Sequence, residues 1–198
     1  WQVTLGARWF DYDDELSNVT AFPFFDFTTA ESNETGDDGF IFKFNTSYEF
    51  TPDVMGYLTV SEGYRVGGLN LGPPCPNPLP PNQTFCLNPD EVLIEPDTTT
   101  NYEVGMRSLW LDGRWLVNAA AYYIDWNDIQ VLGTSDVGEV PITTNGGTAE
   151  SIGLELTTRL SVTDSLELAA SLTLNDAQLT SNARGLVDGA AAFDGDRL

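Results

Sequence analysis

Histidine is absent from this 198-residue sequence, and lysine occurs only once. No apolar run is long enough for a transmembrane helix, which needs about 18 residues or more. Without histidine, Ser-His-Asp and Cys-His catalysis and the usual zinc ligand sets are excluded. The chain has 8 Lys and Arg against 30 Asp and Glu, for a net charge of −22. Phosphate contacts need basic side chains on a common face, so we expect no nucleic-acid partner.

Cysteine occurs only twice, as Cys75 and Cys86 at the two ends of the segment CPNPLPPNQTFC. A metal or redox pair inside the cell and a loop disulfide are the two interpretations of such a pair. The spacing is not that of a CxxC motif, and no further Cys or His is present to complete a metal site. A disulfide between Cys75 and Cys86 in an oxidising compartment is the favoured interpretation. We predict no metal site, no cofactor and no catalytic group in this chain.

Apolar and polar residues alternate with a period of two over most of the chain, which is typical of amphipathic β-strands. In WQVTLGARW, the apolar side chains from Trp1 to Trp9 share one face, and Gln2, Thr4 and Arg8 share the other. The same alternation recurs in FIFKFNTSYEF, SIGLELTTRL and SLELAASLTLND, and no segment shows a convincing helical period. We predict seven strands, at about residues 1–11, 39–50, 54–66, 99–110, 114–131, 143–160 and 166–178.

The joints between the predicted strands are alternately short and long. Short turns are expected at about 51–53, 111–113 and 161–165, and long joints at about 12–38, 67–98 and 132–142. Asp112-Gly113 is a strong hairpin signal, because glycine accepts a positive φ without steric cost. The pattern predicts an all-β, antiparallel up-and-down meander with two unlike rims. Because the sequence begins within an alternating segment and ends without a closing strand, we expect it to be part of a longer protein.

Two all-β architectures would place such strands differently. A soluble β-sandwich hides the apolar faces between two sheets, whereas a membrane barrel turns them toward lipid and keeps a polar interior. The predicted strands are long enough to cross a bilayer, which takes about 9–11 tilted residues, and the unlike rims also favour the barrel. Aromatic residues cluster near strand ends, as an interfacial girdle requires. They are Trp1, Trp9, Phe50, Tyr57, Trp110, Trp115, Tyr122, Tyr123 and Trp126.

Four segments of the chain carry a resemblance to a known family. LGARW at 5–9 is similar to an L-G-x-R-Y strand, and YLTVSEGYRVGGLN at 57–70 to the segment Y-x-x-x-S-x-G-Y/F-R-x-G-G. EPDTTTNYEVGMRSLWLDGRWLVNAAAYYIDWNDIQV resembles a Pro-Glu followed by N-Y-E-x-G-x-K and N-x-A-x-F-x-x-D-x-x-D-x-Q. TNGGTAESIGLELTTRL resembles N-x-G-x-A-x-x-x-G-x-E-x-E. In this order and spacing the segments resemble TonB-dependent outer-membrane receptors, with Asp97 where the family usually has Glu and Arg107 where it often has Lys.

The resemblance implies that residues 1–198 are a partial barrel domain, which contributes about seven strands to a transmembrane barrel of about 22 strands. It implies a location in the bacterial outer membrane, in contact with lipid and lipopolysaccharide. It further implies uptake of a scarce, bulky nutrient, such as a ferric siderophore, cobalamin or an oligosaccharide. A TonB-type energy-coupling protein would drive uptake through an N-terminal region absent from this sequence. A passive porin-type channel and a soluble carbohydrate-binding β-sandwich are the alternatives.

Two regions are candidates for substrate binding. The segment FPFFDF places a cluster of phenylalanines on an otherwise polar joint, where they either grip an apolar ligand or bury one another. Tyr64 and Arg65, at the end of the strand most similar to the family, form the second candidate region. The clustered phenylalanines are Phe22, Phe24, Phe25 and Phe27.

Acidic residues crowd the long joints. Eight lie between Tyr12 and Gly39 and four lie in 67–98, and neither joint contains a Lys or Arg. Binding of a divalent cation or a cationic ligand is one interpretation of this charge, and a solvated rim is the favoured one.

Charged residues also lie on the polar faces of the predicted strands. We expect them to form cross-strand ion pairs that stiffen the wall, in preference to a path that guides an anionic substrate. The basic residues are Arg8, Lys43, Arg107 and Arg159, and the neighbouring acids are Glu49, Glu103 and Glu155.

The strand at 54–66 illustrates the expected arrangement. Thr59 and Ser61 would face a water-filled lumen, while Leu58 and Val60 would face lipid. Gly67 and Gly68 would let the chain bend away from the rim, because glycine tolerates conformations that other residues resist.

Overall fold

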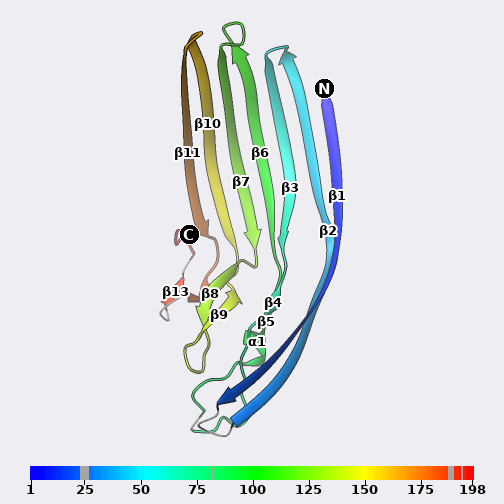
Figure 1. The fold of residues 1–198 in the computed structure, drawn as a ribbon, viewed down its shortest axis with the longest axis vertical. Helices are drawn as coiled ribbons and strands as arrows, with labels where there is room; N and C mark the ends of the chain where they lie inside the picture. Colours follow the sequence, from blue (N-terminus) through cyan, green and yellow to red (C-terminus); the bar gives the residue numbers. More distant parts are fainter. Residues whose placement is uncertain (23–26, 82, 187–189, 193) are drawn as a thin grey trace.

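The computed structural model describes residues 1–198 apart from 23–26, 82, 187–189 and 193. Its main feature is a single antiparallel sheet of seven strands, in which each strand pairs with the next wall strand along the chain (Figure 1). The strands, in their order across the sheet, are β1 (Gln2–Phe22), β2 (Phe27–Thr51), β3 (Val54–Arg65), β6 (Asp97–Trp110), β7 (Trp115–Asn127), β10 (Ala149–Thr163) and β11 (Leu166–Leu179).

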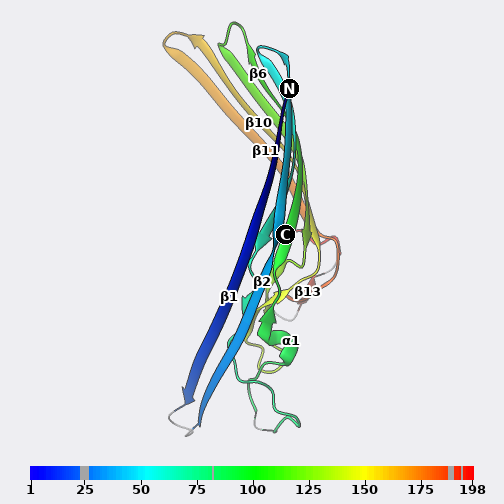
Figure 2. The same cartoon turned by 90° about the vertical axis from the view of Figure 1, so that its right-hand side faces the viewer.

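The sheet forms a curved wall with short turns at one end and long excursions at the other (Figures 1 and 2). The prediction of an up-and-down meander is therefore confirmed. The short turns lie between β2 and β3, β6 and β7, and β10 and β11. At the β6–β7 turn, Leu111, Asp112 and Gly113 all have a positive φ, of 56°, 56° and 81°. No second sheet lies against the apolar face within the described residues, so the β-sandwich alternative was wrong.

The joint predicted at 12–38 is mostly strand. β1 and β2 stay in continuous register from Gln2↔Ser47 to Phe22↔Phe27, which makes a hairpin far longer than the rest of the wall. Figure 2 shows it projecting beyond the other strands. The described side chains of its outer part are mostly exposed and polar on both faces. A ribbon with two solvated faces needs no apolar alternation, and so the sequence pattern did not reveal it.

Two of the predicted strands each correspond to two separate strands of the structure. The strand predicted at 114–131 is β7 followed by β8 (Gln130–Thr134), separated where Asp128 has a φ of 55°. The strand predicted at 143–160 is β9 (Pro141–Asn145) followed by β10, separated at Gly147, which has a φ of 84°. A left-handed backbone breaks the pleat of a strand without changing the alternation of the residues around it.

Smaller elements fill the long excursions. β4 (Gly68–Leu69) pairs with β5 (Leu93–Ile94), and the four-residue helix α1 (Pro89–Val92) precedes β5. β8 pairs with β9, and β12 (Ala183–Leu186) pairs with β13 (Ala190–Ala192). Among the described residues, no helix has the length and apolar character to cross a membrane.

The buried apolar residues lie in the long excursions and at the end of the wall next to them, which we call the outer end. Large apolar side chains of the wall are instead exposed, as with Leu5 at 76% and Leu172 at 53%. A single sheet has no partner layer to bury such residues, so another apolar medium has to cover them. The buried apolar residues are Cys86, Leu87, Ile94, Ile129, Ile142, Ala149 and Leu179.

Candidate functional site

The strand registers separate the wall into an apolar face and a polar face. One row across all seven strands contains Val3, Thr46, Leu58, Val104, Ala121, Leu154 and Leu174. The adjacent row, which points to the opposite face, contains Thr4, Asn45, Thr59, Glu103, Tyr122, Gly153 and Asn175. Because side chains alternate along every strand, the same division repeats along the wall up to the row of Leu5. Nearer the long excursions the first face is polar as well, with Glu62, Thr100 and Asp125 in one row. The wall thus has the two-sided character of a barrel with a wet interior.

Hydrogen bonds connect neighbouring strands across the polar face. Asn45 Nδ2 donates to Thr59 Oγ1 at 2.8 Å, and Tyr57 Oη donates to Glu103 Oε1 at 2.7 Å. Such side-chain contacts add to the backbone ladder and hold the wall in one register. Thr59 therefore lies on the polar face, as predicted.

Two tyrosine rings on this face cover glycines of the adjacent strand. A Cβ atom at Gly105 would collide with the ring of Tyr57, and a Cβ atom at Gly153 would collide with the ring of Tyr122. Each ring thus lies across its neighbour's backbone, where only glycine leaves room. These pairs could have been predicted from the sequence, because a glycine inside an alternating strand indicates that another group approaches the backbone closely.

The expected ladder of ion pairs is mostly absent. Arg159 Nε lies 3.5 Å from Glu167 Oε1 on the adjacent strand. Among the described residues, no carboxylate lies within 4.0 Å of the basic groups of Arg8, Lys43 or Arg107. The guanidinium of Arg107 instead lies over the Tyr57 ring, 5.6 Å from its centroid. The prediction that matching charges would pair was wrong at these three positions.

The predicted aromatic girdle is also smaller than expected. Tyr57 and Tyr122 lie on the polar face, and Trp126 packs against the buried cluster of Ile129, Ala149 and Leu179. The other six predicted girdle residues remain exposed on the apolar face, namely Trp1, Trp9, Phe50, Trp110, Trp115 and Tyr123. The girdle was predicted from the position of these residues near strand ends, which does not show the face on which a side chain lies. Whether a residue has an odd or an even number within its strand does show the face.

At the outer end of the wall, Arg65 is held in a network of polar contacts. Its guanidinium forms an ion pair with Asp97, which is only 3% exposed, and Arg65 Nη2 donates to the Gln130 carbonyl at 3.1 Å. The Gln130 backbone N–H donates to the same Asp97 carboxylate at 3.1 Å. The arginine also lies over Trp126, 5.7 Å from the ring centroid. Arg65 thus ties β3, β6 and β8 together. Its contact with a substrate stays a prediction.

Tyr64 joins the wall to the long β1–β2 hairpin. Its ring stacks on Phe10 with centroids 3.9 Å apart, and its hydroxyl donates to Asp37 Oδ2 at 3.0 Å. Gly67 N donates to Tyr12 Oη at 3.1 Å in the same region. Burial raises the pKa of Tyr64, and hydrogen bonds with Tyr12 and Asp37 raise it further. The phenol is therefore kept neutral, as a donor to the carboxylate.

The excursions between β3 and β6 and between β7 and β10 are joined into one cap, which we define as residues 66–96 and 128–147 without residue 82. Three side-chain amides make the connections. Asn70 Nδ2 donates to the Thr143 carbonyl at 2.6 Å, and Asn145 Nδ2 donates to the Glu95 carbonyl at 2.9 Å. Gln130 Nε2 donates to the Glu95 carbonyl at 3.0 Å. Sequence reasoning did not single out these residues, because nothing local reveals a partner that lies 35 to 73 residues away.

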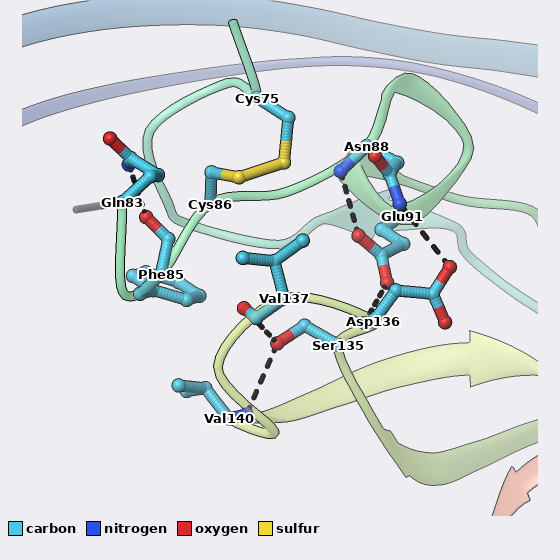
Figure 3. Close-up of a disulfide and its surroundings, with 10 residues drawn as sticks. All are labelled: Cys75, Gln83, Phe85, Cys86, Asn88, Glu91, Ser135, Asp136, Val137 and Val140. Atoms are coloured by element: carbon cyan, nitrogen blue, oxygen red, sulfur yellow. Dashed lines mark hydrogen bonds between the residues drawn. A yellow bond between two sulfur atoms is a disulfide. The ribbon is translucent and has the colours of Figure 1, made fainter. Parts of the chain in front are cut away.

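The disulfide lies inside this cap (Figure 3). Cys75 and Cys86 are bonded, with Cα atoms 4.8 Å apart, and Cys86 pairs with Val137 across the two excursions. Glu91 accepts hydrogen bonds from Asn88 N at 2.7 Å and from Asp136 N at 2.6 Å. Covalent and polar contacts together fix the cap as one packed unit.

Gly67 meets a steric requirement at the base of the cap. A Cβ atom there would collide with the Ile94 carbonyl oxygen. The glycine is thus required by close approach to a neighbouring backbone, and its φ is not in the left-handed range. This differs from the predicted role of permitting a bend.

The phenylalanine cluster cannot be placed as a site. Phe22 is the last residue of β1 and Phe27 the first of β2, and their backbones are partners in the ladder of the long hairpin. Phe24 and Phe25 lie outside the described residues. Binding of an apolar ligand by these four residues stays a prediction. Within the part of the chain that the structure describes, no group of three or more acids or cysteines could hold a metal ion.

A curved, two-faced antiparallel wall with short turns at one end and an elaborate cap at the other defines the class of transmembrane β-barrel walls. Residues 1–198 match the family described as TonB dependent receptor-like, beta-barrel. The chain belongs to this family, and the resemblance identified in its sequence is confirmed.

Solved structures show the same fold. The chain is similar to the ferric yersiniabactin uptake receptor FyuA from Yersinia pestis, at 18% identity and a TM-score of 0.72, covering 98% of this chain and 26% of that one. It is similar to the siderophore receptor PiuA from Acinetobacter baumannii, at 18% identity and a TM-score of 0.70, with coverage of 98% and 26%. The copper transporter OprC matches at 16% identity and a TM-score of 0.69, with coverage of 98% and 30%. The chain thus spans about a quarter of the length of FyuA and PiuA.

Proposed function

We propose that this chain is part of the wall of a bacterial outer-membrane receptor that takes up a scarce nutrient by active transport. The observation that carries the proposal is the match of residues 1–198 to the receptor family, together with a wall that is apolar on one face and polar on the other. In this role the chain is a partial barrel domain. Its apolar face contacts membrane lipid and lipopolysaccharide, and its polar face lines the transport path.

The substrate class we favour is a metal bound to a small carrier molecule. Two of the similar structures are receptors for siderophores or a ferric siderophore, and a third is a copper transporter. The acidic rim supports a substrate without high negative charge, since the chain carries −22 overall. Cobalamin and oligosaccharides are less favoured substrates. The function is transport and not catalysis.

We further propose that a TonB-type protein supplies the energy, through a region of the protein outside this chain. The test is uptake of radiolabelled iron, presented with a panel of siderophores to cells that express the full-length protein. Uptake should require both the receptor and the energy-coupling protein. A passive channel would give the same uptake after deletion of the energy-coupling protein, and that result would replace this proposal with the porin-type alternative.

A further inference from the structure

The wall opens between β2 and β3 near its outer end. The ladder between these strands ends at the pair Lys43↔Ser61, although both strands continue beyond it. Outward from this pair, β2 follows β1 and β3 follows β6. One carboxylate oxygen of Glu62 accepts a hydrogen bond from Phe42 N at 2.9 Å, where the next ladder contact would have been. The divergence of the two strands therefore leaves a slot bordered by both of them.

This slot is a cavity of about 320 Å³ with an unusual combination of side chains. Phe10, Phe40 and Tyr64 supply aromatic rings, and Asp37 and Glu62 supply carboxylates. Three consecutive threonines of β6, residues 98–100, supply hydroxyl groups. No Lys or Arg is among the described residues that line it. Its volume is at the lower end of the range for small-molecule sites, which begins at about 300 Å³.

The two carboxylates have no cationic partner within the described chain. The three ion pairs found among the described residues involve other acids, namely Asp97, Glu167 and Asp176. Asp37 is held by the Tyr64 hydroxyl, and Glu62 by Phe42 N, so both groups have fixed positions. Fixed carboxylates beside aromatic faces attract a cation through charge-assisted hydrogen bonds and through the ring quadrupole.

We propose that the slot is a binding site for an organic ammonium ion whose hydrocarbon part contacts the aromatic rings. The ammonium group would donate hydrogen bonds to Glu62, Asp37 and a threonine hydroxyl. A calcium ion fits less well, because it takes about six to eight oxygen ligands and gains nothing from aromatic rings. The proposal does not rest on the uptake function, because the residues of the slot would bind the ion whether or not the protein transports a nutrient.

The test uses the full-length protein in detergent and isothermal titration calorimetry with phenethylammonium as the probe. The neutral analogue 2-phenylethanol has the same ring and nearly the same shape. We expect one phenethylammonium to bind per receptor and the alcohol to bind more weakly by about tenfold or more, the equivalent of one charge-assisted hydrogen bond. Equal binding of the two compounds would show only an apolar patch, and no binding of the ammonium ion would also overturn the proposal.

Matched variants separate the slot from the general acidity of the hairpin. Glu62→Gln removes one charge and keeps an oxygen that can accept from Phe42 N, so the local fold is retained. Glu34→Gln removes the same charge from the neighbouring β1–β2 hairpin, which also carries Asp37, at an exposed position outside the slot. We expect Glu62→Gln and Asp37→Asn each to weaken phenethylammonium binding by about tenfold and Glu34→Gln to leave it unchanged. Equal weakening by all three would show that diffuse charge attracts the probe, and the site assignment would then be wrong.

Discussion

Replacement of Leu172 by arginine places a charge on the face of β11 that we assign to lipid. Leu172 is 53% exposed and pairs with Leu156 of β10. The apolar row of β11 runs from Leu166 to Leu174, which is about 21 Å of membrane depth at about 3.4 Å per residue and a tilt of about 40°. Leu172 then lies about 5 Å from the middle of that band by the same geometry. Near the midplane, an arginine on the lipid face costs about 2–4 kcal/mol.

We therefore expect Leu172→Arg to lower the free energy of unfolding of the full-length protein in phospholipid vesicles by about 2–4 kcal/mol. The assay is denaturant unfolding followed by tryptophan fluorescence, with heat-modifiable gel mobility as the check on folding. Ser171→Arg is the matched control, because Ser171 is adjacent in sequence but pairs with Thr157 on the polar face. Its cost should stay within about 0.5 kcal/mol, as at a solvated position. Equal costs at both positions, or the larger cost at Ser171, would refute the assignment of the faces.

Three further predictions follow from the cap, the glycine pairs and the rim tyrosine. With the Cys75–Cys86 bond intact, mass spectrometry should show the non-reduced protein lighter than the reduced protein by two hydrogen atoms. Cys75→Ser should lower the local stability of the cap by about 3 kcal/mol and so increase hydrogen exchange at 66–96 and 128–147. Unchanged exchange would count against a cap held as one unit. Gly153→Val should lower the yield of folded protein, because the added Cβ atom would collide with the Tyr122 ring. Gly6→Ala is the control and should be neutral, because a Cβ atom there has its nearest neighbour at an ordinary 3.6 Å. Equal yields would contradict the packing of rings over glycines. Because the pKa of Tyr64 is raised, the stability from its hydrogen bond to Asp37 is fully present below about pH 10, the usual tyrosine value, and is lost as pH rises through the folded-state pKa. Absorbance titration at about pH 11 should therefore show as many tyrosinates in the folded full-length protein as in folded Tyr64→Phe, and about one more in the parent than in the variant once both are unfolded. An extra tyrosinate in the folded parent would contradict the raised pKa.

The strands of the wall could be predicted from the sequence, because their pattern depends on residues that are close together in the chain. Alternation along a strand records which face meets an apolar medium, so Trp1 to Trp9 and Phe40 to Phe50 could be assigned without coordinates. The short turns were equally predictable, since Asp112-Gly113 encodes its own backbone conformation. Family motifs then supplied the barrel, which alternation alone could not distinguish from a sandwich.

The outer part of the molecule was not predictable in the same way. Residues 12–22 and 27–38 form paired strands. Their described side chains, at 12–17 and 32–38, are mostly exposed on both faces, and such a stretch carries no periodic signal. The cap depends on Asn70 and Asn145, whose partners lie far away in sequence. The slot exists only because β2 and β3 diverge after Lys43↔Ser61, a tertiary event with no local sequence mark.

The central claim is that one face of this wall meets lipid and the other meets water. Spin labels placed singly at each residue from Ile152 to Leu160 of β10, in the full-length protein reconstituted in phospholipid, test it most directly. Collision rates with oxygen, which concentrates in lipid, should peak at the even-numbered residues, and rates with a water-soluble nickel complex should peak at the odd-numbered ones. A profile without a period of two, or one with the phases exchanged, would contradict the account.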